Sequence, residues 1–133
     1  MARASGDPGP GTSRPPPGHR QRLGARGERL AADWYRAHGY TVVARNWRCR
    51  EGEIDLIVAR RGELVFCEVK TRSSDRFGVP AEAVTPAKQA RLRALAARFL
   101  ADQAPGGGRR GWSLRFDVAA VTAGRIEVLE GAF

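Results

Sequence analysis

Hydrophobic residues recur along this chain with two different spacings. Leucine, alanine and aromatic residues repeat every three or four positions between residues 21 and 38, and again after residue 86. That spacing gathers them on one face of an α-helix. Thr85-Pro86 offers an N-cap followed by a proline in the first turn. The pattern therefore predicts one helix over residues 21–38 and a second that begins near residue 86.

The remaining hydrophobic stretches favour β-strands, because they are rich in β-branched and aromatic residues. They cover residues 40–47, 53–59, 63–71, 112–121 and 125–130. The short Arg-Arg-Gly sequence between the second and third of them is typical of a hairpin turn. The predicted order is α-β-β-β-α-β-β, an α/β fold with a mixed sheet and helices packed on it.

The length of 133 residues suits one domain. Residues 1–19 contain five of the eight prolines and almost no large apolar side chain, so we expect a disordered tail there and the folded domain over 20–133. No apolar run approaches the length of a membrane span, and no signal segment opens the chain. Its two cysteines form no metal-binding or disulfide pattern. These features predict a cytoplasmic protein without a membrane partner.

The formal net charge of +9 favours a polyanionic partner, with nucleic acid first and an anionic membrane second. A soluble basic protein is the plain alternative, since charge alone does not exclude it. Of the 23 basic residues only Lys70 and Lys88 are lysines. A lysine that persists among so many arginines is a candidate for a role that needs a compact ammonium whose pKa can shift.

The stretch LVFCEVKTR (residues 64–72) places Glu68 and Lys70 on one face of a strand that is otherwise apolar. With Arg61-Gly62 at the turn, Asp55 lies opposite Glu68, and Glu53 lies opposite Lys70. Cross-strand partners have Cβ atoms roughly 4.5–5.5 Å apart. Three carboxylates and one ammonium then share one patch. The other face is expected to hold Ile54, Leu56, Val58, Val65, Cys67 and Val69.

Two ionised carboxylates at this distance repel each other, which raises the pKa of one of them unless a cation intervenes. Mg²⁺ or Mn²⁺ held by Asp55 and Glu68 resolves the conflict, since hard cations prefer oxygen ligands. Such an ion assists phosphodiester hydrolysis, and Lys70 beside it is placed to orient or deprotonate a water. The alternative is an ordinary surface ion pair between Glu53 and Lys70, which contributes little.

Basic residues surround this acidic patch in the sequence. Candidate contacts to a nucleic-acid backbone are Arg45, Arg48, Arg50, Arg72 and Lys88. Lys88, near the start of the second helix, is a phosphate contact or an accessory active-site residue. Trp47 suits either stacking on an unpaired base or packing, and packing is favoured. For Asp117, a hydrogen-bonding role in the core is favoured over catalysis.

The segments GEIDLI (52–57) and VFCEVKTR (65–72) resemble the motifs of the PD-(D/E)XK nuclease superfamily. More closely, the chain resembles the YraN family of predicted bacterial endonucleases. The matching segments are GERLAADWYRAHGY (27–40), RNWRCREGEIDLI (45–57), EVKTR (68–72), GVPAEAVTPAK (78–88) and RFDV (115–118). The resemblance covers residues 21–133.

This resemblance implies a restriction-endonuclease-like αβββαβ core in which Asp55, Glu68 and Lys70 form the catalytic set. It also implies that Glu28 on the first helix completes the metal site, although helical spacing alone is equally compatible with a solvated Glu28. The expected function is a Mg²⁺- or Mn²⁺-dependent endonuclease, with DNA favoured over RNA and branched DNA as a candidate substrate. A homodimer is expected by analogy with junction-cleaving enzymes. The alternative is a nucleic-acid-binding module that keeps the fold without cutting.

Overall fold

A computed structural model describes residues 19–72, 84–103 and 111–133, with side chains from residue 25 onward. The proline-rich segment before His19 lies outside the described residues. The elements, in chain order, are α1 His19–Ala37, β1 Thr41–Cys49, β2 Gly52–Arg60, β3 Glu63–Arg72, α2 Pro86–Ala101, β4 Ser113–Thr122 and β5 Arg125–Leu129. This order confirms the prediction. Over the described ranges, no helix is long and apolar enough to cross a membrane.

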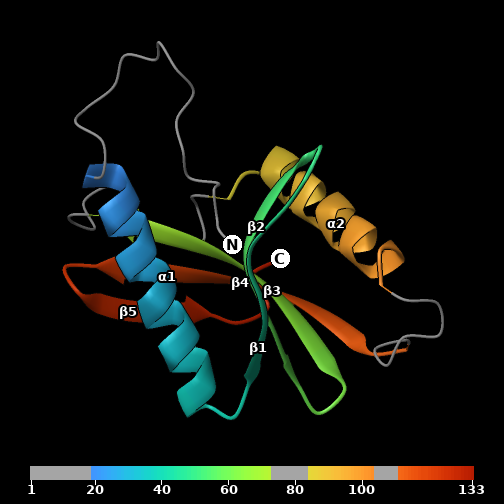
Figure 1. Ribbon diagram of the computed structural model, residues 1–133, viewed down its shortest axis with the longest axis horizontal. Coiled ribbons are helices and arrows are strands. Elements are labelled where there is room, and N and C mark those ends of the chain that lie inside the picture. The colour runs from blue at the N-terminus through green and yellow to red at the C-terminus, as the bar shows by residue number, and fades with distance from the viewer. Residues whose placement is uncertain (1–18, 73–83, 104–110) are drawn as a thin grey trace.

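The five strands form one mixed sheet in the order β1-β2-β3-β4-β5. Neighbouring strands are antiparallel except for β3 and β4, which are parallel. Parallel neighbours require a crossover connection, and α2 lies on that crossover. The helices cover opposite faces of the sheet (Figure 1). The architecture is a mixed α/β fold consistent with a restriction-endonuclease-like core.

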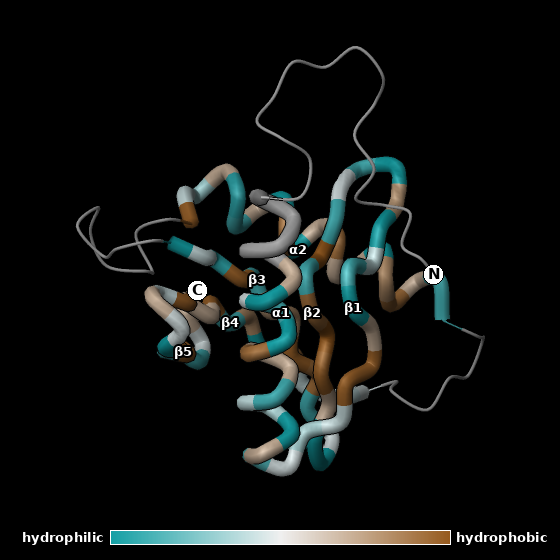
Figure 2. Tube along the Cα trace, turned by 60° about the vertical axis from the view of Figure 1, so that its left-hand side comes forward, coloured by the Kyte–Doolittle hydropathy of each residue, from teal (hydrophilic) through white to brown (hydrophobic). Residues whose placement is uncertain are grey.

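Each helix covers its own hydrophobic cluster. The α1 cluster contains Ala31, Ala32, Tyr35, Tyr40, Leu56, Val58, Val65, Cys67 and Ala119. The α2 cluster contains Ile54, Ile57, Ala59, Leu64, Phe66, Val84, Leu92, Leu95, Ala96, Phe99, Phe116 and Val118. Strand β2 contributes to both and is hydrophobic over much of its length (Figure 2). Because both faces of β2 and β3 are covered, a charged side chain in the middle of these strands loses much of its contact with water, as Glu68 does.

The hairpin register was predicted correctly for the regular part of the β2–β3 ladder. Arg61 and Gly62 form a two-residue turn, and both have positive φ, as such hairpin turns require. The pairs run from Arg60 with Glu63 to Leu56 with Cys67. A second turn of the same kind, Ala123-Gly124, joins β4 to β5.

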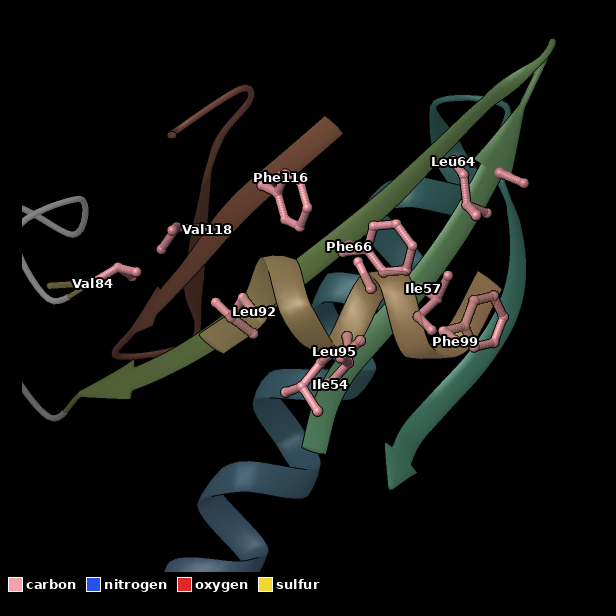
Figure 3. Packing of buried hydrophobic residues seen from close by; sticks show 12 residues of the cluster. Ile54, Ile57, Leu64, Phe66, Val84, Leu92, Leu95, Phe99, Phe116 and Val118 are labelled. Atoms are coloured by element: carbon pink, nitrogen blue, oxygen red, sulfur yellow. The ribbon is translucent and has the colours of Figure 1, made fainter. Parts of the chain in front are cut away.

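The predicted apolar face was wrong for Ile54. Strict alternation places Ile54 on the same face as Leu56, but Ile54 packs with Ile57 in the α2 cluster (Figure 3). Leu56 belongs to the α1 cluster. Two residues three positions apart share a face only where the period of two is interrupted. The interruption falls at Asp55, a predicted site residue.

Asp117 fixes β4 to α1 and to the C-terminal segment through a buried polar network. Its carboxylate accepts hydrogen bonds from the Tyr35 hydroxyl at 2.6 Å, from Arg115 Nε at 2.8 Å and from the Gly131 N–H at 3.0 Å. Burial is the main cause of a raised pKa of Tyr35, so its hydroxyl remains a donor. Asp117 is fully buried, and a buried carboxylate requires such partners. The prediction of a core hydrogen-bonding role is confirmed.

Helix α1 lies in close contact with β3 at Gly27. A Cβ atom added there would lie 2.3 Å from Thr71 Oγ1 and 3.5 Å from Val69 Cγ1. Glycine thus allows the helix to lie directly on the strand that carries Glu68. The next residue, Glu28, is brought to the sheet by the same approach.

Replacing Gly27 with alanine tests this contact by the sign of its effect. Alanine is the better helix former by about 1 kcal/mol, but the clash with Thr71 is an overpacking that costs about 1–3 kcal/mol. We expect Gly27→Ala to lower the free energy of unfolding in urea. In a Thr71→Ala background, where the hydroxyl is absent, the same change should be stabilising. Equal stabilisation in both backgrounds would contradict the close approach.

Candidate active site

The predicted site lies where β2 separates from β3. The β2–β3 ladder ends at the pair Leu56 and Cys67. One residue further along, Asp55 Oδ2 accepts a hydrogen bond of 2.8 Å from the Val69 N–H. A side chain of β2 has taken the place of a main-chain acceptor, and beyond this point the two strands run apart (Figures 1 and 3). The polar side chains in this fork are those that the sequence singled out.

Glu68 lies on the α2 face of β3 with only 8% of its surface exposed. Its Oε2 atom is 2.8 Å from Lys88 Nζ and 3.4 Å from Lys70 Nζ. Lys88 stands in the first turn of α2, where its N–H donates to the Thr85 cap hydroxyl at 3.2 Å. Helix α2 therefore delivers a second ammonium to the acidic site. This contact supports the accessory active-site reading of Lys88.

Asp55 is the carboxyl group of the site whose pKa is raised. Burial, followed by the negative charge of Glu68, raises the pKa of Asp55 from its ordinary value near 3.8 to about 7. The Val69 N–H opposes this increase, whereas Glu28 and Glu53 add to it. Thus residues of β2, β3 and α1 all place negative charge near Asp55, which favours the protonated form of its carboxyl group.

The pKa values of the two lysines shift in opposite directions. Burial and the adjacent Lys88 lower the pKa of Lys70, although Glu68 opposes the change. Partial burial alone would also lower the pKa of Lys88, but its closer contact with Glu68, together with Lys70 and Asp55, raises it instead. Lys88 is accordingly the lysine of the pair that retains its proton more strongly. Lys70 is the one that more readily gives up its proton.

Glu28 lies on α1, and its place in a metal site, which the resemblance implied, stays a prediction. It is half-buried, its charge acts on Asp55, and its Oε1 accepts a hydrogen bond of 2.9 Å from Asn46 Nδ2. Asn46 was missed by the sequence reasoning. The available signal was an asparagine inside a predicted strand, a position where this residue is uncommon.

The predicted pair of Glu53 and Lys70 was wrong. Glu53 lies opposite Arg48 of β1, and Arg48 Nη2 is 3.4 Å from its carboxylate. Lys70 instead pairs with Glu68 of its own strand. The reason is the separation of the strands, since the part of β2 that carries Glu53 is paired with β1 and no longer with β3.

The other predicted nucleic-acid contacts lie around the fork. Arg45 on β1 and Arg50 in the β1–β2 turn are exposed, and over the described ranges neither side chain forms an ion pair. Arg72 is half-buried at the end of β3. Trp47 packs edge-on against Phe99 of α2, with ring centroids 5.5 Å apart, which confirms its packing role. Binding of nucleic acid by these arginines stays a prediction.

The oxygen donors available to a metal ion are the carboxylates of Asp55 and Glu68, with Glu28 nearby. Among the residues that the structure describes, no three His, Cys, Asp or Glu side chains form a ready-made metal cage. Histidine and cysteine ligands, which zinc prefers, are not part of the fork as described. The donor set is a hard one of oxygens.

The sequence matches one protein family over most of its length. The model of the family described as "Uncharacterised protein family UPF0102" matches residues 27–121. The chain belongs to the UPF0102 family. A UPF0102 protein of Frankia alni is 50% identical over 118 residues, covering 84% of this chain and 93% of its own. A UPF0102 protein of Beutenbergia cavernae is 55% identical over 115 residues, covering 82% and 93%.

A third similar protein also covers nearly the whole of its own chain. The UPF0102 protein of Moorella thermoacetica is 46% identical over 120 residues, covering 86% of this chain and 97% of its own. The matched range of the family contains every predicted site residue, from Glu28 to Lys88. The YraN-like resemblance is confirmed at the level of this family.

The raised pKa of Asp55 predicts how stability depends on pH. Asparagine at this position keeps an oxygen for the Val69 N–H but removes the charge. A raised pKa in the folded state gives stability that is complete below about pH 4 and is lost as the pH rises through about 7. We expect Asp55→Asn to change the free energy of unfolding little at pH 4. At pH 8 it should raise it by on the order of 2–4 kcal/mol.

The measurement is urea unfolding of both proteins from pH 4 to pH 8 without divalent cations. Asp33→Asn is the matched control, because Asp33 is exposed on α1 and its pair with Arg36 spans 3.4 Å at the surface. Its stability curve should run parallel to that of the wild type. If the curve for Asp55→Asn also runs parallel to that of the wild type, the pKa of Asp55 is not raised in the folded protein.

Proposed function

We propose that this UPF0102 protein is a metal-dependent endonuclease of the PD-(D/E)XK type that hydrolyses phosphodiester bonds in nucleic acid. The observation that carries the proposal is the buried Glu68 with Lys70 and Lys88 on one oxygen, in a fork that also contains Asp55. Removing several charges from water costs free energy, so this arrangement would not stabilise a strand whose role is only structural. An acidic centre of this kind suits a cation and a phosphate.

The donor set fits Mg²⁺ or Mn²⁺ better than other common metals. Mg²⁺ is usually held by one or two carboxylates, and water and substrate phosphate oxygens complete its shell. Asp55 and Glu68 supply such a pair, with Glu28 available through α1. The ion, when bound, would polarise the scissile phosphodiester and stabilise the negative charge that develops on its oxygens.

The lysines divide the remaining chemistry between them. Lys70, with its lowered pKa, is able to accept a proton from the attacking water or to orient that water. Lys88 keeps its charge and is placed to stabilise the phosphate in the transition state. Asp55 is hydrogen-bonded to the Val69 N–H, so its carboxylate is oriented before any ligand arrives.

The surrounding arginines supply contacts to the phosphate backbone. Arg45 and Arg50 are exposed, and on α1 the exposed Arg26 and Arg29 stand on either side of Glu28 in sequence. Backbone contacts of this kind give affinity without sequence readout. We therefore propose a substrate recognised by shape. The preference for DNA over RNA, for branched or flapped DNA and for action as a homodimer follows from the resemblance to junction-cleaving nucleases.

One observation favours a second function, that of a binding module without catalysis. The charge of Glu68 is already balanced by Lys88 at 2.8 Å and by Lys70 at 3.4 Å, so Glu68 does not need a bound cation. In that case the protein would hold nucleic acid through its arginines alone. Its affinity would fall steeply with salt and would not depend on divalent ions.

A cleavage assay separates these functions. The substrates are end-labelled four-way junction, flap, duplex and single-stranded DNA, together with single-stranded RNA, each with Mg²⁺, with Mn²⁺ or with EDTA. We expect cleavage of at least one substrate that requires the divalent ion. Glu68→Gln and Lys70→Met should each reduce the rate about 10²-fold or more, since each removes a group that acts on the reacting atoms.

The controls are Asp33→Asn and Arg61→Asn, which remove a charge from the exposed surface of α1 and from the β2–β3 turn. Asparagine is chosen for Arg61 because it tolerates the positive φ of 48°. Both should cleave at the wild-type rate. Residual cleavage that is identical in the wild type and both site variants would overturn the catalytic proposal, and binding without metal would favour the second function.

A further inference from the structure

Asn46 has a backbone conformation that its surroundings in the sheet do not require. Three non-glycine residues in the described part have positive φ, namely Asn46, Arg61 and Ala123. Arg61 and Ala123 open two-residue hairpin turns, where positive φ is the normal geometry. Asn46 alone lies inside a strand, with φ of 52° in the middle of β1. Strain of this kind persists only where something else holds it in place.

The position of Asn46 in the sheet is as unusual as its backbone. Arg45 pairs with Leu56 and Trp47 pairs with Ile54, so Asn46 lies opposite Asp55. Both partners depart from regular strand geometry at this level. The backbone of Asn46 is left-handed. At Asp55 the side chain accepts the hydrogen bond from the Val69 N–H of β3. The interrupted alternation between Ile54 and Ile57 falls on the same residue pair.

The side chain of Asn46 links this irregularity to α1. Its Nδ2 atom donates to Glu28 Oε1 at 2.9 Å, across the gap between the first helix and the sheet. An amide N–H₂ donor stabilises a carboxylate without adding a positive charge. It therefore orients Glu28 without neutralising it, which a lysine or arginine at this position would not do.

We propose that Asn46 is a positioning residue, and that its left-handed backbone exists to direct its amide at Glu28 so that this carboxylate faces Asp55. The inference rests on the proposed metal-dependent function. It adds Glu28 of α1 to the proposed metal ligands of β2 and β3, because Asn46 lies opposite Asp55 in the sheet and is hydrogen-bonded to Glu28. Partners that orient metal ligands are worth about 10–100-fold in metal affinity or activity.

The test is a set of variants whose Mn²⁺ affinity is measured by calorimetry in the absence of nucleic acid. Asn46→Gly accepts positive φ freely but lacks the amide. We expect it to bind Mn²⁺ about 10–100-fold more weakly, with a melting temperature near that of the wild type. Asn46→Ala should show the same loss of affinity and a lower melting temperature, since alanine is strained at this φ. In Asn46→Asp the residue still tolerates positive φ, but a carboxylate replaces the amide donor. The carboxylates of residues 46 and 28 should then repel each other.

A double-mutant cycle identifies the route of the effect. In a Glu28→Ala background, Asn46→Gly should cause little further loss of Mn²⁺ affinity, because the group through which Asn46 acts is absent. Ala123→Gly is the control for the added glycine, since Ala123 has φ of 53° and is exposed in the β4–β5 turn. It should leave the affinity unchanged.

The outcomes separate this inference from the proposed function. Equal affinity of the wild type and Asn46→Gly overturns the positioning role while leaving the nuclease proposal intact. A loss that persists undiminished in the Glu28→Ala background also overturns it, since Asn46 would then act without Glu28. Absence of Mn²⁺ binding by the wild type overturns the metal site and the positioning role together. Weakened Mn²⁺ binding in a protein that cleaves nothing supports Asn46 and counts against the nuclease.

Discussion

The hydrogen bond from the Val69 N–H to the Asp55 carboxylate, 2.8 Å long, is the contact on which the site depends. It replaces one link of the β2–β3 ladder by a side chain, and the strands separate immediately beyond it. The fork leaves space for Glu68, Lys70 and Lys88 on one face and brings Glu28 near Asp55 from the other helix. Without that substitution of acceptor, β2 and β3 would continue as an ordinary sheet covered by helices on both faces.

The fork is electrostatically unfavourable, and the rest of the fold offsets its cost. Loss of contact with water, together with the charges of Glu68, Glu28 and Glu53, raises the pKa of the half-buried Asp55 to about 7. Stability comes instead from the two hydrophobic clusters and from Asp117, whose hydrogen bonds join β4, α1 and the C-terminal segment. Strained and destabilised groups that a stable scaffold holds in place are a common feature of functional sites. The separation of the two roles explains why the half-buried Asp55 and the fully buried Asp117 differ so much in their surroundings.

The element order and the hairpin register were predictable, because hydrophobic spacing and a two-residue turn determine them locally. The same register predicted Asp55 opposite Glu68, but the ladder ends one pair earlier and Asp55 accepts a hydrogen bond from the Val69 N–H. The role of Glu28 came from the resemblance and stays a prediction. Asn46, the pairing of Glu53 with Arg48 and the position of Ile54 were not predictable, since all three follow from one interruption of the strand alternation. The contact of Lys88 with Glu68 depends on how α2 crosses the sheet, a tertiary feature that no local pattern contains.

We propose that the carboxylates of Asp55 and Glu68 together bind one divalent cation. The most direct test of this proposal is a crystal structure of the protein with Mn²⁺, in which anomalous scattering locates the ion. We expect an anomalous peak within direct coordination distance of both carboxylates, with Lys88 moved away from Glu68. A crystal that shows no peak in the fork, with Glu68 still paired to Lys88, or a peak only at another position, would contradict it.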